Sequence, residues 1–327
     1  MTFRWGVLGA GRIAAAMVED LGLLDDVEVV AVASRSDVAS AQRFADEHHV
    51  ARAHGSYEEL LADDAVDAVY VAGIHPLHHD AALLAIEAGR AVLVEKPFTM
   101  DAAQARSLVA AARARGVFLM EAMWARFVPH MVRVRELLAE GALGDVRLVV
   151  ADHCQWFAED PSNRLFDPAQ GGGALLDLGI YPVSFASMVL GTPNGVTAVS
   201  VPAFTGVDAT TSMVLSYDGG AQSVLTTTLA AQGPNRAAVV GTEARLEIDP
   251  TFYAPSSFTL TRRDGTVLER WDEPPVGHGL RHEAAEVARC VTAGRLESDV
   301  LPLDETVAIM ATLDEVRRQV GLDYSAL

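Results

Sequence analysis

A glycine-rich turn near the start of the chain is the feature that most limits the folds open to it. The turn, Gly9-Ala10-Gly11, directly follows an apolar run at Phe3–Leu8 and opens a helical pattern. Glycine permits the backbone conformations of a tight turn, and the first N–H groups of a helix have no partner within the helix. A strand, a glycine turn and a helix in this order predict the first βαβ unit of a parallel sheet.

The first part of the chain continues this alternation. Up to about Met123, short β-branched runs alternate with helical patterns, which predicts a parallel sheet with covering helices. Ser56 and Asp101 begin sequences spaced as capping boxes, and Gly89 and Gly116 stand where helices would stop. The expected strands are residues 3–8, 27–33, 68–72, 91–95 and 117–120.

The second part of the chain has a different pattern. From about Asp145, long strand-like segments take over; Asp218-Gly219 separates two of them and Asp264-Gly265 falls inside the last, and Asp-Gly is a hairpin signal. Two helical stretches, 282–293 and 303–320, end the chain and could pack on the first domain. The expected strands are residues 146–157, 196–203, 212–217, 221–229, 237–248 and 258–271.

These patterns predict an α/β protein of two domains. Residues 1–123 are expected to form a Rossmann domain with a doubly wound parallel sheet. Residues 124–327 are expected to form an α+β domain that carries a large, mostly antiparallel open sheet and serves substrate binding.

Composition narrows the class of partner. The net charge of −19 argues against nucleic acid, because binding to phosphates depends on Lys and Arg. The two cysteines, Cys154 and Cys290, are too few for a disulfide framework or a zinc site. The sequence shows neither a signal peptide nor an apolar run of membrane-spanning length. We therefore expect a small-molecule ligand, no membrane, no metal and a cytoplasmic location.

The glycine turn and the end of the second strand together predict a dinucleotide cofactor. Backbone N–H groups after Gly9 and Gly11 can reach a pyrophosphate at the helix start. Where NAD-binding chains usually carry an acidic residue, this chain has Ser34-Arg35. A hydroxyl and a guanidinium suit a 2′-phosphate, which a carboxylate would repel. NADP is thus favoured over NAD.

A lysine stands at the carboxyl end of the fourth expected strand. Lys96 lies between Glu95 and Pro97, directly after the apolar run at 91–95. Open α/β sheets bind ligands at the carboxyl ends of their strands, and proline makes the turn rigid. Lys96 is therefore the leading catalytic candidate.

A second group of candidates follows three consecutive glycines. Asp177 and Tyr181 are spaced i,i+4, which places them on one helix face if the helix begins near Gly173. Pro182 offers an alternative, in which it marks the first turn of the helix and Asp177 lies in a loop. In both cases the two side chains stay close together.

Oxidation of an alcohol gives these residues a shared task. A base must take the hydroxyl proton while a hydride leaves the same carbon, and a tyrosine with a pKa of about 10 needs a nearby cation to act at neutral pH. Lys96 can supply that cation, and Asp177 can hold a substrate hydroxyl.

The same motifs resemble the Gfo/Idh/MocA oxidoreductase family. The resemblance rests on the glycine turn, on Glu95-Lys96-Pro97 and on the Asp177 to Tyr181 segment, and it covers essentially the whole chain. The sequences around Trp124 and Gly171 look like the branch of dimeric dihydrodiol dehydrogenases, D-xylose dehydrogenases and glucose–fructose oxidoreductase.

The resemblance implies roles for individual residues and an assembly. It implies that Lys96, Tyr181 and Asp177 do the catalytic work and that the sheet of the second domain builds a homodimer. The residues expected to contact the cofactor are Gly9, Gly11, Arg12, Ile13, Ser34, Arg35, Ala72, His75, His78, Glu95, Lys96 and Pro97. The residues expected to contact the substrate are Trp124, Arg126, Phe157, Asp177 and Tyr181.

Two departures from the family pattern stand near the expected site. Gly73-Ile74 replaces the usual Thr/Ser-Pro of a cofactor loop, and His282 stands where a tyrosine is frequent. The neighbouring histidines His75, His78 and His79 are not expected to bind a metal, because no cysteine completes a ligand set.

The function expected from these observations is hydride transfer between NADP and a hydroxyl-bearing carbon of an aldose, a cyclic polyol or a dihydrodiol. Two alternatives stay open. The chain could reduce a sugar-derived ketone or dicarbonyl, since hydride transfer is reversible, or it could be a non-catalytic dinucleotide-binding regulator.

Overall fold

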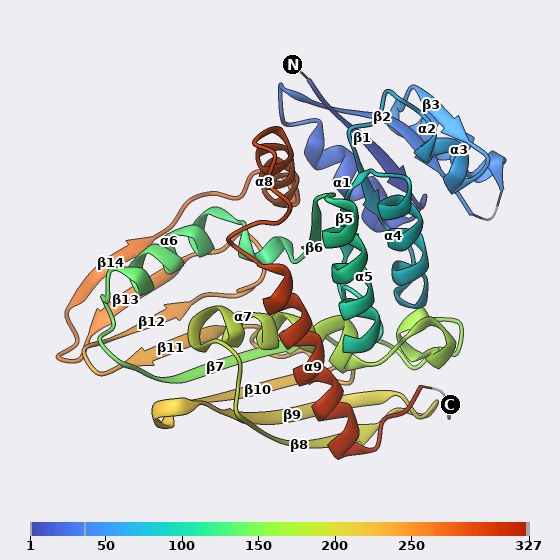
Figure 1. Ribbon diagram of the computed structural model, residues 1–327. Helices are drawn as coiled ribbons and strands as arrows, with labels where there is room; N and C mark the ends of the chain where they lie inside the picture. Colours follow the sequence, from blue (N-terminus) through green and yellow to red (C-terminus); the bar gives the residue numbers. More distant parts are fainter. Residues whose placement is uncertain (1, 36, 325–327) are drawn as a thin grey trace. The chain divides into compact units, whose positions relative to one another are not determined.

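The computed structural model describes residues 2–35 and 37–324, and the chain divides into two compact units. Unit 1 consists of Met1–Phe127 and Gly277–Thr306, and unit 2 consists of Val128–Val276 and Val307–Leu327. Each unit is built on a sheet of its own (Figure 1). The expected mixed α/β fold with two different sheets is confirmed.

Unit 1 contains the predicted parallel sheet. Across the described residues it has six strands in the order β3 (Arg52–His54), β2 (Val27–Ala33), β1 (Phe3–Leu8), β4 (Ala68–Val71), β5 (Ala91–Glu95) and β6 (Leu119–Ala122). Every residue of β4 and β5 is buried, as expected for strands covered on both faces. The strand order reverses between β1 and β4, and open sheets bind ligands at such a switch point.

The helices of unit 1 begin and end largely where their capping residues predicted. Asp101 accepts a hydrogen bond from the N–H of Gln104, Ser56 accepts one from Glu59, and Gly116 ends its helix with a φ of 66°. Strand β3 was not anticipated, because three residues are too few for a periodic signal. The helices are α1 (Arg12–Leu21), α2 (Val38–His48), α3 (Tyr57–Leu61), α4 (His78–Glu87) and α5 (Ala102–Arg115), with short turns η1 (His75–Leu77) and η2 (Trp124–Arg126).

The chain returns to unit 1 after the second sheet. Helix α8 (Arg281–Thr292) packs against α1 and β5. The buried carboxylate of Asp20 accepts hydrogen bonds of 2.6, 2.8 and 3.0 Å from the N–H groups of His278, Gly279 and Arg281. A residue of α1 therefore caps the start of α8. Unit 1 is thus built from two separate stretches of chain.

Unit 2 contains the large open sheet. Within the described part of the chain its eight strands run in the order β14 (Val267–Trp271), β13 (Phe258–Arg262), β12 (Ala244–Ile248), β11 (Ala237–Gly241), β7 (Val146–Cys154), β10 (Gln222–Thr228), β9 (Asp208–Ser216) and β8 (Gly195–Pro202). Its neighbouring strands pair antiparallel, except that β7 and β10 run parallel. The expected mostly antiparallel sheet is confirmed.

Two of the strands expected in this sheet are hairpins instead. The segment 237–248 turns at residues 241–243, and the segment 258–271 turns around Asp264-Gly265. Gly241 lies so close to the backbone of Leu143 that a Cβ at 241 would stand 2.1 Å from the carbonyl oxygen. This close approach depends on tertiary packing, so the strand pattern alone did not reveal the first turn. Gly265 has a φ of 93°, which suits the Asp-Gly turn.

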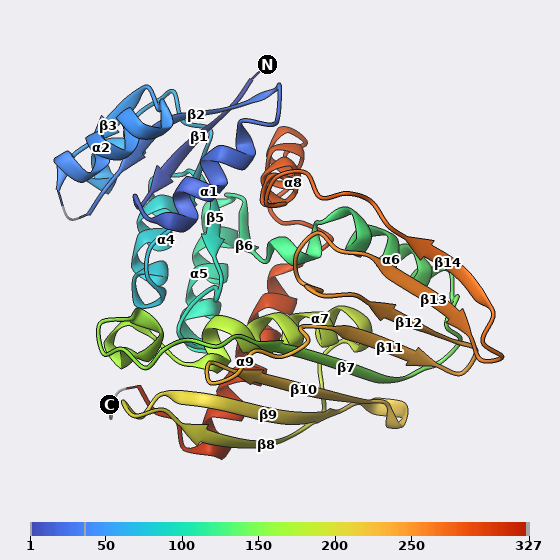
Figure 2. The same ribbon diagram turned by 180° about the vertical axis from the view of Figure 1, so that it is seen from behind.

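Helices cover one face of this sheet. The apolar segment that ends in α7 (Ile180–Leu190) packs against β7 and β10, as Figure 2 shows from behind. By length and composition alone, residues 168–190 could span a membrane, but 83% of the most apolar window is buried inside the protein, as in a core helix. The other helical elements are α6 (Pro129–Ala139), η3 (Arg164–Phe166), η4 (Pro168–Gln170), the π-helix η5 (Leu175–Gly179), η6 (Asp218–Gly220) and α9 (Leu303–Val320), which crosses from unit 1 into unit 2.

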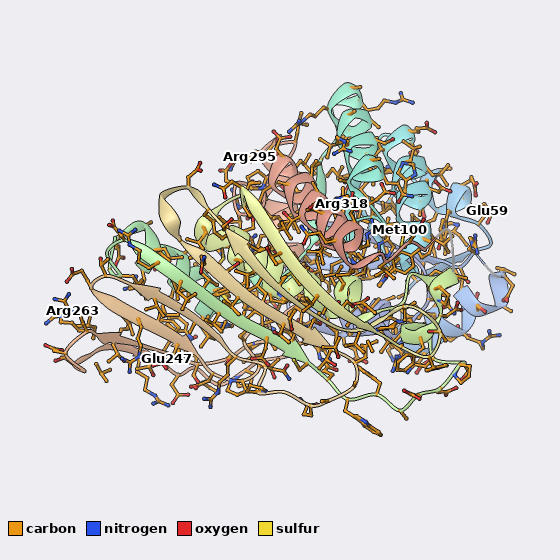
Figure 3. All side chains as sticks on the ribbon, turned by 90° about the horizontal axis from the view of Figure 1, so that it is seen from below. Glu59, Met100, Glu247, Arg263, Arg295 and Arg318 are labelled. Carbon is orange, nitrogen blue, oxygen red and sulfur yellow. The ribbon has the colours of Figure 1, made fainter. Side chains whose placement is uncertain are left out.

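The opposite face of the sheet is exposed. Figure 3 looks along this face, with Glu247 labelled on β12. Along β10 and β7, Val224 and Val150 stand directly opposite each other and are 42% and 41% exposed. Their sequence neighbours Ser223 and Val149 point the other way and are fully buried. The alternation leaves β-branched apolar side chains in solvent on one side of the sheet.

Candidate active site

The glycine turn of unit 1 has the geometry of an anion cradle. Gly9 has a φ of 120°, and a Cβ there would lie 2.7 Å from the carbonyl oxygen of Ala72, at the end of β4. Gly11 is the N-cap of α1, which has neither a side-chain cap nor an acidic residue in its first turn. A Cβ at Gly11 would meet no described atom within 4 Å. The turn thus presents the helix N-terminus, with Arg12 and Ile13, to open space beside Ala72.

The two residues that are predicted to bind the 2′-phosphate of NADP lie in the same unit, at the end of β2. Ser34 is buried directly after the strand, and Arg35 is exposed. No carboxylate among the described residues forms an ion pair with Arg35. An exposed guanidinium of this kind has donors available for a dianionic group.

The loop after β4 is tied to the lysine turn by a histidine. His78 is fully buried, with its Nδ1 2.8 Å from the carbonyl oxygen of Pro97 and its Nε2 3.1 Å from that of Gly73. Burial lowers the pKa of His78 to about 4, and the neighbouring His75 adds to this effect. A neutral imidazole carries one N–H, so the shorter contact indicates that His78 donates to Pro97.

The Glu95-Lys96-Pro97 turn is held by hydrogen bonds to the side-chain carboxylate of Glu95. Glu95 accepts hydrogen bonds from the hydroxyl of Tyr70 and, at 3.0 Å, from the N–H of Lys96. In the stretch 91–99, Lys96 is the only residue that is not buried. The strand and the turn are therefore fixed in the core, and Lys96 is half-buried at its end.

Carboxyl groups lie buried behind this turn. Glu121 accepts a 3.0 Å hydrogen bond from the N–H of Phe98, and burial raises its pKa to about 7, with the charge of Glu95 adding to the shift. Glu283 of α8 is fully buried, and neither of its oxygens has a hydrogen-bond partner among the described residues. Burial, with Glu95, Glu121 and Asp20 nearby, raises the pKa of Glu283 well above its ordinary value. Sequence reasoning did not single out Glu121 or Glu283.

Two predicted substrate residues lie in η2 after β6. Trp124 is half-buried. Arg126 is buried, and its guanidinium forms a 2.7 Å ion pair with Glu305. The ion pair gives Arg126 a structural partner within unit 1, and a contact with substrate stays a prediction.

In unit 2, Asp177 and Tyr181 stand one turn apart on a continuous helical segment. The segment begins as the π-helix η5 and continues as α7, so the helix does begin near Gly173, and Pro182 lies inside it. Asp177 is buried and accepts a 3.1 Å hydrogen bond from Arg164. The structure therefore favours the helical alternative over a loop for Asp177.

Pro182 explains why this segment departs from a regular α-helix. Proline has no N–H to donate to the carbonyl of Leu178, four residues earlier. The Nδ1 of His153, on β7, lies 3.2 Å from that carbonyl oxygen and donates to it instead. A freed carbonyl with an outside donor is a common setting for a π-turn, and such turns are frequent at functional sites.

An aromatic cluster surrounds Tyr181, and sequence reasoning missed it. The ring of His153 packs edge-on to Tyr181, with centroids 5.1 Å apart, and stacks on Tyr253 at 3.8 Å. The Nε2 of Gln155 lies 2.9 Å from the Nε2 of His153 and 3.0 Å from the hydroxyl of Tyr253. His153 lies on β7 and Gln155 directly follows the strand's last residue, and their i,i+2 spacing was the one local signal that they share a face.

The start of the Asp177 helix is held from a neighbouring strand. Asp208 of β9 accepts hydrogen bonds from the N–H of Leu175 at 2.8 Å and from the hydroxyl of Thr211 at 2.7 Å. Burial raises the pKa of Asp208 to about 7, although both hydrogen bonds act in the opposite direction. Tyr324 donates a 2.6 Å hydrogen bond to the carbonyl of Gly172. Asp208 and Tyr324 thus fix the glycine triplet from which the helix starts.

The remaining predicted substrate residue packs on a small apolar cluster. Phe157 is partly buried against Leu165, Phe166, Ala174, Leu178 and Leu229.

No group of three or more metal-binding side chains occurs in residues 2–35 and 37–324. The predicted site residues therefore fall into two sets, a cofactor set with Lys96 on unit 1 and an acid/base set with Tyr181 on unit 2.

Comparisons with known proteins identify both parts of the chain. Residues 3–123 match the model of an oxidoreductase family with an NAD-binding Rossmann fold, and residues 131–247 match the GFO/IDH/MocA C-terminal domain. The chain is 38% identical to the trans-1,2-dihydrobenzene-1,2-diol dehydrogenase of Xenopus tropicalis, over 99% of this chain and 100% of that one.

Two solved structures are also similar over nearly the whole chain. A 3-ketoreductase from Actinomadura kijaniata, in complex with NADP and TDP-benzene, is 28% identical with a TM-score of 0.85. An aldose-aldose oxidoreductase from Caulobacter crescentus, complexed with glycerol, is 25% identical with a TM-score of 0.88. Each alignment covers 98% of this chain and 98% of the other chain.

Proposed function

The chain belongs to the GFO/IDH/MocA oxidoreductase family, and on that premise we propose that it is an NADP-dependent dehydrogenase of a diol or a sugar. The observation that carries this proposal is the full-length likeness to dihydrodiol dehydrogenases, in a chain that has Glu95-Lys96-Pro97 at the end of β5 and Tyr181 in α7. In this reaction a base of the chain would take the hydroxyl proton, and the bound cofactor would supply the acceptor for the hydride.

The residues of unit 1 fit the proposed cofactor. The open N-terminus of α1 at Gly11 suits a pyrophosphate, and the exposed Arg35 beside Ser34 suits a 2′-phosphate. When bound, NADP supplies a nicotinamide carbon that accepts or returns a hydride. We further propose that the loop with Ala72 and His75 contacts the nicotinamide side, while His78 holds that loop against the lysine turn.

The acid/base roles are part of the same proposal. Tyr181 accepts the hydroxyl proton, and the positive charge of Lys96 favours the phenolate that this requires. Asp177 and Trp124 hold the substrate. A 3-ketoreductase among the similar structures supports the reverse reaction, reduction of a ketone, as the second candidate.

One spectrophotometric screen tests the function. The purified protein is mixed with NADP or NAD and a panel of trans-dihydrodiols, aldoses, inositols and other cyclic polyols, and NADPH or NADH is followed at its absorbance band. We expect reduction of NADP with at least one diol or sugar. Turnover with none of the panel in either direction, despite NADP binding, would instead support a non-catalytic regulator, and higher kcat/KM with NAD would contradict the cofactor assignment.

We also propose that the protein is a homodimer that pairs through the exposed face of the large sheet. Val150, Val214 and Val224 form one row across three adjacent strands, and Val199 and Val201 extend the apolar surface onto β8. Contiguous exposed apolar surface of this kind is typical of a protein interface, and a flat sheet face can pair with itself about a two-fold axis. The free, buried Cys154 and Cys290 support the proposed cytoplasmic location.

A further inference from the structure

Three buried carboxyl groups lie together behind the turn that carries Lys96. Glu95 ends β5, and Glu121 lies on the neighbouring strand β6. Glu283 comes from α8, which packs against β5 and η2. Their exposed fractions are 4%, 0% and 0%, and each carboxyl group is close enough to another to influence its ionisation. We call these three residues the carboxyl cluster.

The carboxyl cluster is joined to the lysine turn through the backbone. The N–H of Lys96 donates a 3.0 Å hydrogen bond to Glu95, and the N–H of Phe98 donates one of 3.0 Å to Glu121. The residues on both sides of Pro97 are therefore held by carboxyl groups. A change of charge in the cluster is consequently a change of charge directly beside the turn of Lys96.

Glu283 is the member of the cluster that is least able to carry a charge. Neither of its oxygens has a hydrogen-bond partner among the described residues. A fully buried carboxylate without hydrogen bonds is strongly destabilised, whereas the protonated carboxyl group is much less so. Burial also raises the pKa of Glu121 to about 7. The cluster is therefore expected to retain protons at neutral pH.

The acidic surroundings of the cluster extend to α1. The groups that face Glu283 from α1, β5 and β6 are Asp20, Glu95 and Glu121, and all of them are acidic. Arg281, also on α8, lies 3.8 Å from the carboxylate of Asp20. Ionisation of Glu283 or of Glu121 is therefore opposed by neighbouring negative charge.

Two cations lie near the cluster. Arg126 of η2 acts on Glu121, and its guanidinium also forms the 2.7 Å ion pair with Glu305. Lys96 stands on the turn itself. On the proposed function, the oxidised cofactor adds the positive charge of its ring beside this turn, and the reduced cofactor adds none. A nearby positive charge favours the ionised form of a carboxyl group.

We infer that the carboxyl cluster is a proton site linked to the oxidation state of the cofactor, which loses a proton when NADP⁺ binds and keeps it when NADPH binds. The inference rests on the proposed cofactor site beside Lys96. Oxidation of an alcohol frees one proton in addition to the hydride, so the overall reaction supplies the proton that the cluster takes up. Because coupled carboxyl groups titrate together, the proton belongs to the cluster and not to one residue.

Isothermal titration calorimetry tests this inference without turnover. The full-length protein is titrated at pH 7 with NADP⁺ and with NADPH, in PIPES, MOPS and imidazole at one ionic strength. The dependence of the heat on the ionisation enthalpy of the buffer gives the number of protons exchanged. Both forms of the cofactor carry the same phosphates, so their difference isolates the charge of the ring.

We expect NADP⁺ to release about half a proton more than NADPH does, because a group with a pKa near 7 is about half protonated at this pH. By linkage, the ratio of Kd for NADP⁺ to Kd for NADPH should fall about fivefold as the pH rises from 6 to 8. Equal proton counts for the two forms, or a ratio that does not change with pH, would overturn the inference.

Substitutions assign the proton to the cluster. Glu121→Gln and Glu283→Gln preserve the size of the side chain, and the glutamine at 121 can still accept from Phe98. In the double variant the difference in proton count between NADP⁺ and NADPH should fall close to zero. Loss of the difference in either single variant also supports the inference. A difference that is undiminished in both single variants contradicts it, whether or not the double variant folds.

A matched control lies one turn further along the same helix. Glu286 accepts two hydrogen bonds of 2.8 Å from Arg289, so it is ionised with either cofactor. Glu286→Gln makes the same chemical change on α8 and should leave the difference in proton count unaltered. Loss of the difference in this variant would show that the cluster is not its source.

The outcomes also separate the inference from the proposed function. A protein that binds neither NADP⁺ nor NADPH refutes the cofactor site of the proposed function. A protein that binds both forms, and exchanges the same number of protons with each, refutes the inference alone.

Discussion

At the scale of single residues, the choice of lysine at position 96 stands out. The chain has 25 lysine and arginine residues, and Lys96 is the only lysine among them. Arginine is permanently charged, whereas a lysine can lose its proton and take part in acid/base chemistry. The remaining residues of this set are all arginine. The lysine at position 96 therefore suggests that proton exchange or a compact charge is needed there.

This contrast yields a prediction for two substitutions. Lys96→Met and Lys96→Arg should each lower kcat by ~100-fold or more, because one removes the charge that favours the phenolate and the other replaces a compact ammonium by a larger, planar guanidinium. Binding of NADPH, measured by fluorescence titration, should stay within severalfold, since the anion cradle at Gly11 lies on a different strand-to-helix turn. Turnover near the wild-type level in Lys96→Met would contradict the role of the lysine.

The single lysine also supplies a direct measurement. Reductive methylation with isotope-labelled formaldehyde adds reporter groups to the side-chain amine of Lys96 and to the chain's amino terminus. The NMR signal of Lys96 can then be followed against pH, with Lys96→Arg identifying the other signal. A change in this titration on binding NADP would link the lysine to the cofactor.

At the scale of elements, the helical segment formed by η5 and α7 depends on groups outside itself. Its first turn is held by Asp208 on β9, and the carbonyl that Pro182 frees is held by His153 on β7. Helix N-termini leave backbone N–H groups unpaired, so an acceptor from a neighbouring strand stabilises this end. Two strands therefore set the position of Asp177 and Tyr181.

The burial of Asp208 predicts a pH dependence of stability. Its pKa of about 7 in the folded protein lies above the ordinary value of 3.8, so between these values the folded state holds a proton that the unfolded state has lost. Stability from this residue is therefore present at low pH and is lost as the pH rises toward 7. Asp208→Asn cannot ionise, and its amide oxygen can still accept from Leu175.

Thermal unfolding of the variant and the wild type tests the direction of this change of stability with pH. The melting temperature of Asp208→Asn minus that of the wild type should increase by a few degrees as the pH is raised from 5 to 8. A difference between the two proteins that is constant with pH, or that shrinks as the pH rises, would mean that Asp208 is already ionised in the folded state.

At the scale of the whole molecule, the proposed dimer would bury the apolar side chains that the sheet face exposes in a single chain. Val224 lies in the middle of the sheet, on β10 between β7 and β9. Val224→Lys should convert the protein from dimer to monomer in light-scattering chromatography, because a charge would be buried without a partner at the interface. Val267→Lys, on the edge strand β14, changes an exposed valine outside that central row and should leave the dimer intact. A wild-type protein that is already monomeric would refute the proposal.

Much of the fold follows from local patterns along the chain. Strands β1, β2 and β5 begin and end where their largely apolar runs predicted, since buried parallel strands are rich in apolar residues. Gly116 ends α5 because few other residues adopt its positive φ. The turn after Gly241 was not predicted, because it depends on the approach of Leu143 from elsewhere in the chain.

The sequence by itself determined the two-sheet fold, the glycine turn before α1 and the lysine at the end of β5. Each follows from local patterns, in which the residues that matter are close together in the sequence. The tertiary structure alone decided that Asp20 caps α8, that Asp208 caps the helix of Tyr181 and that His153 and Gln155 meet Tyr253. Gln155 and Tyr253 are 98 positions apart, and their contact exists only once the sheet has formed. Hydrogen-bond partners across such distances are set by packing, and no local periodicity records them.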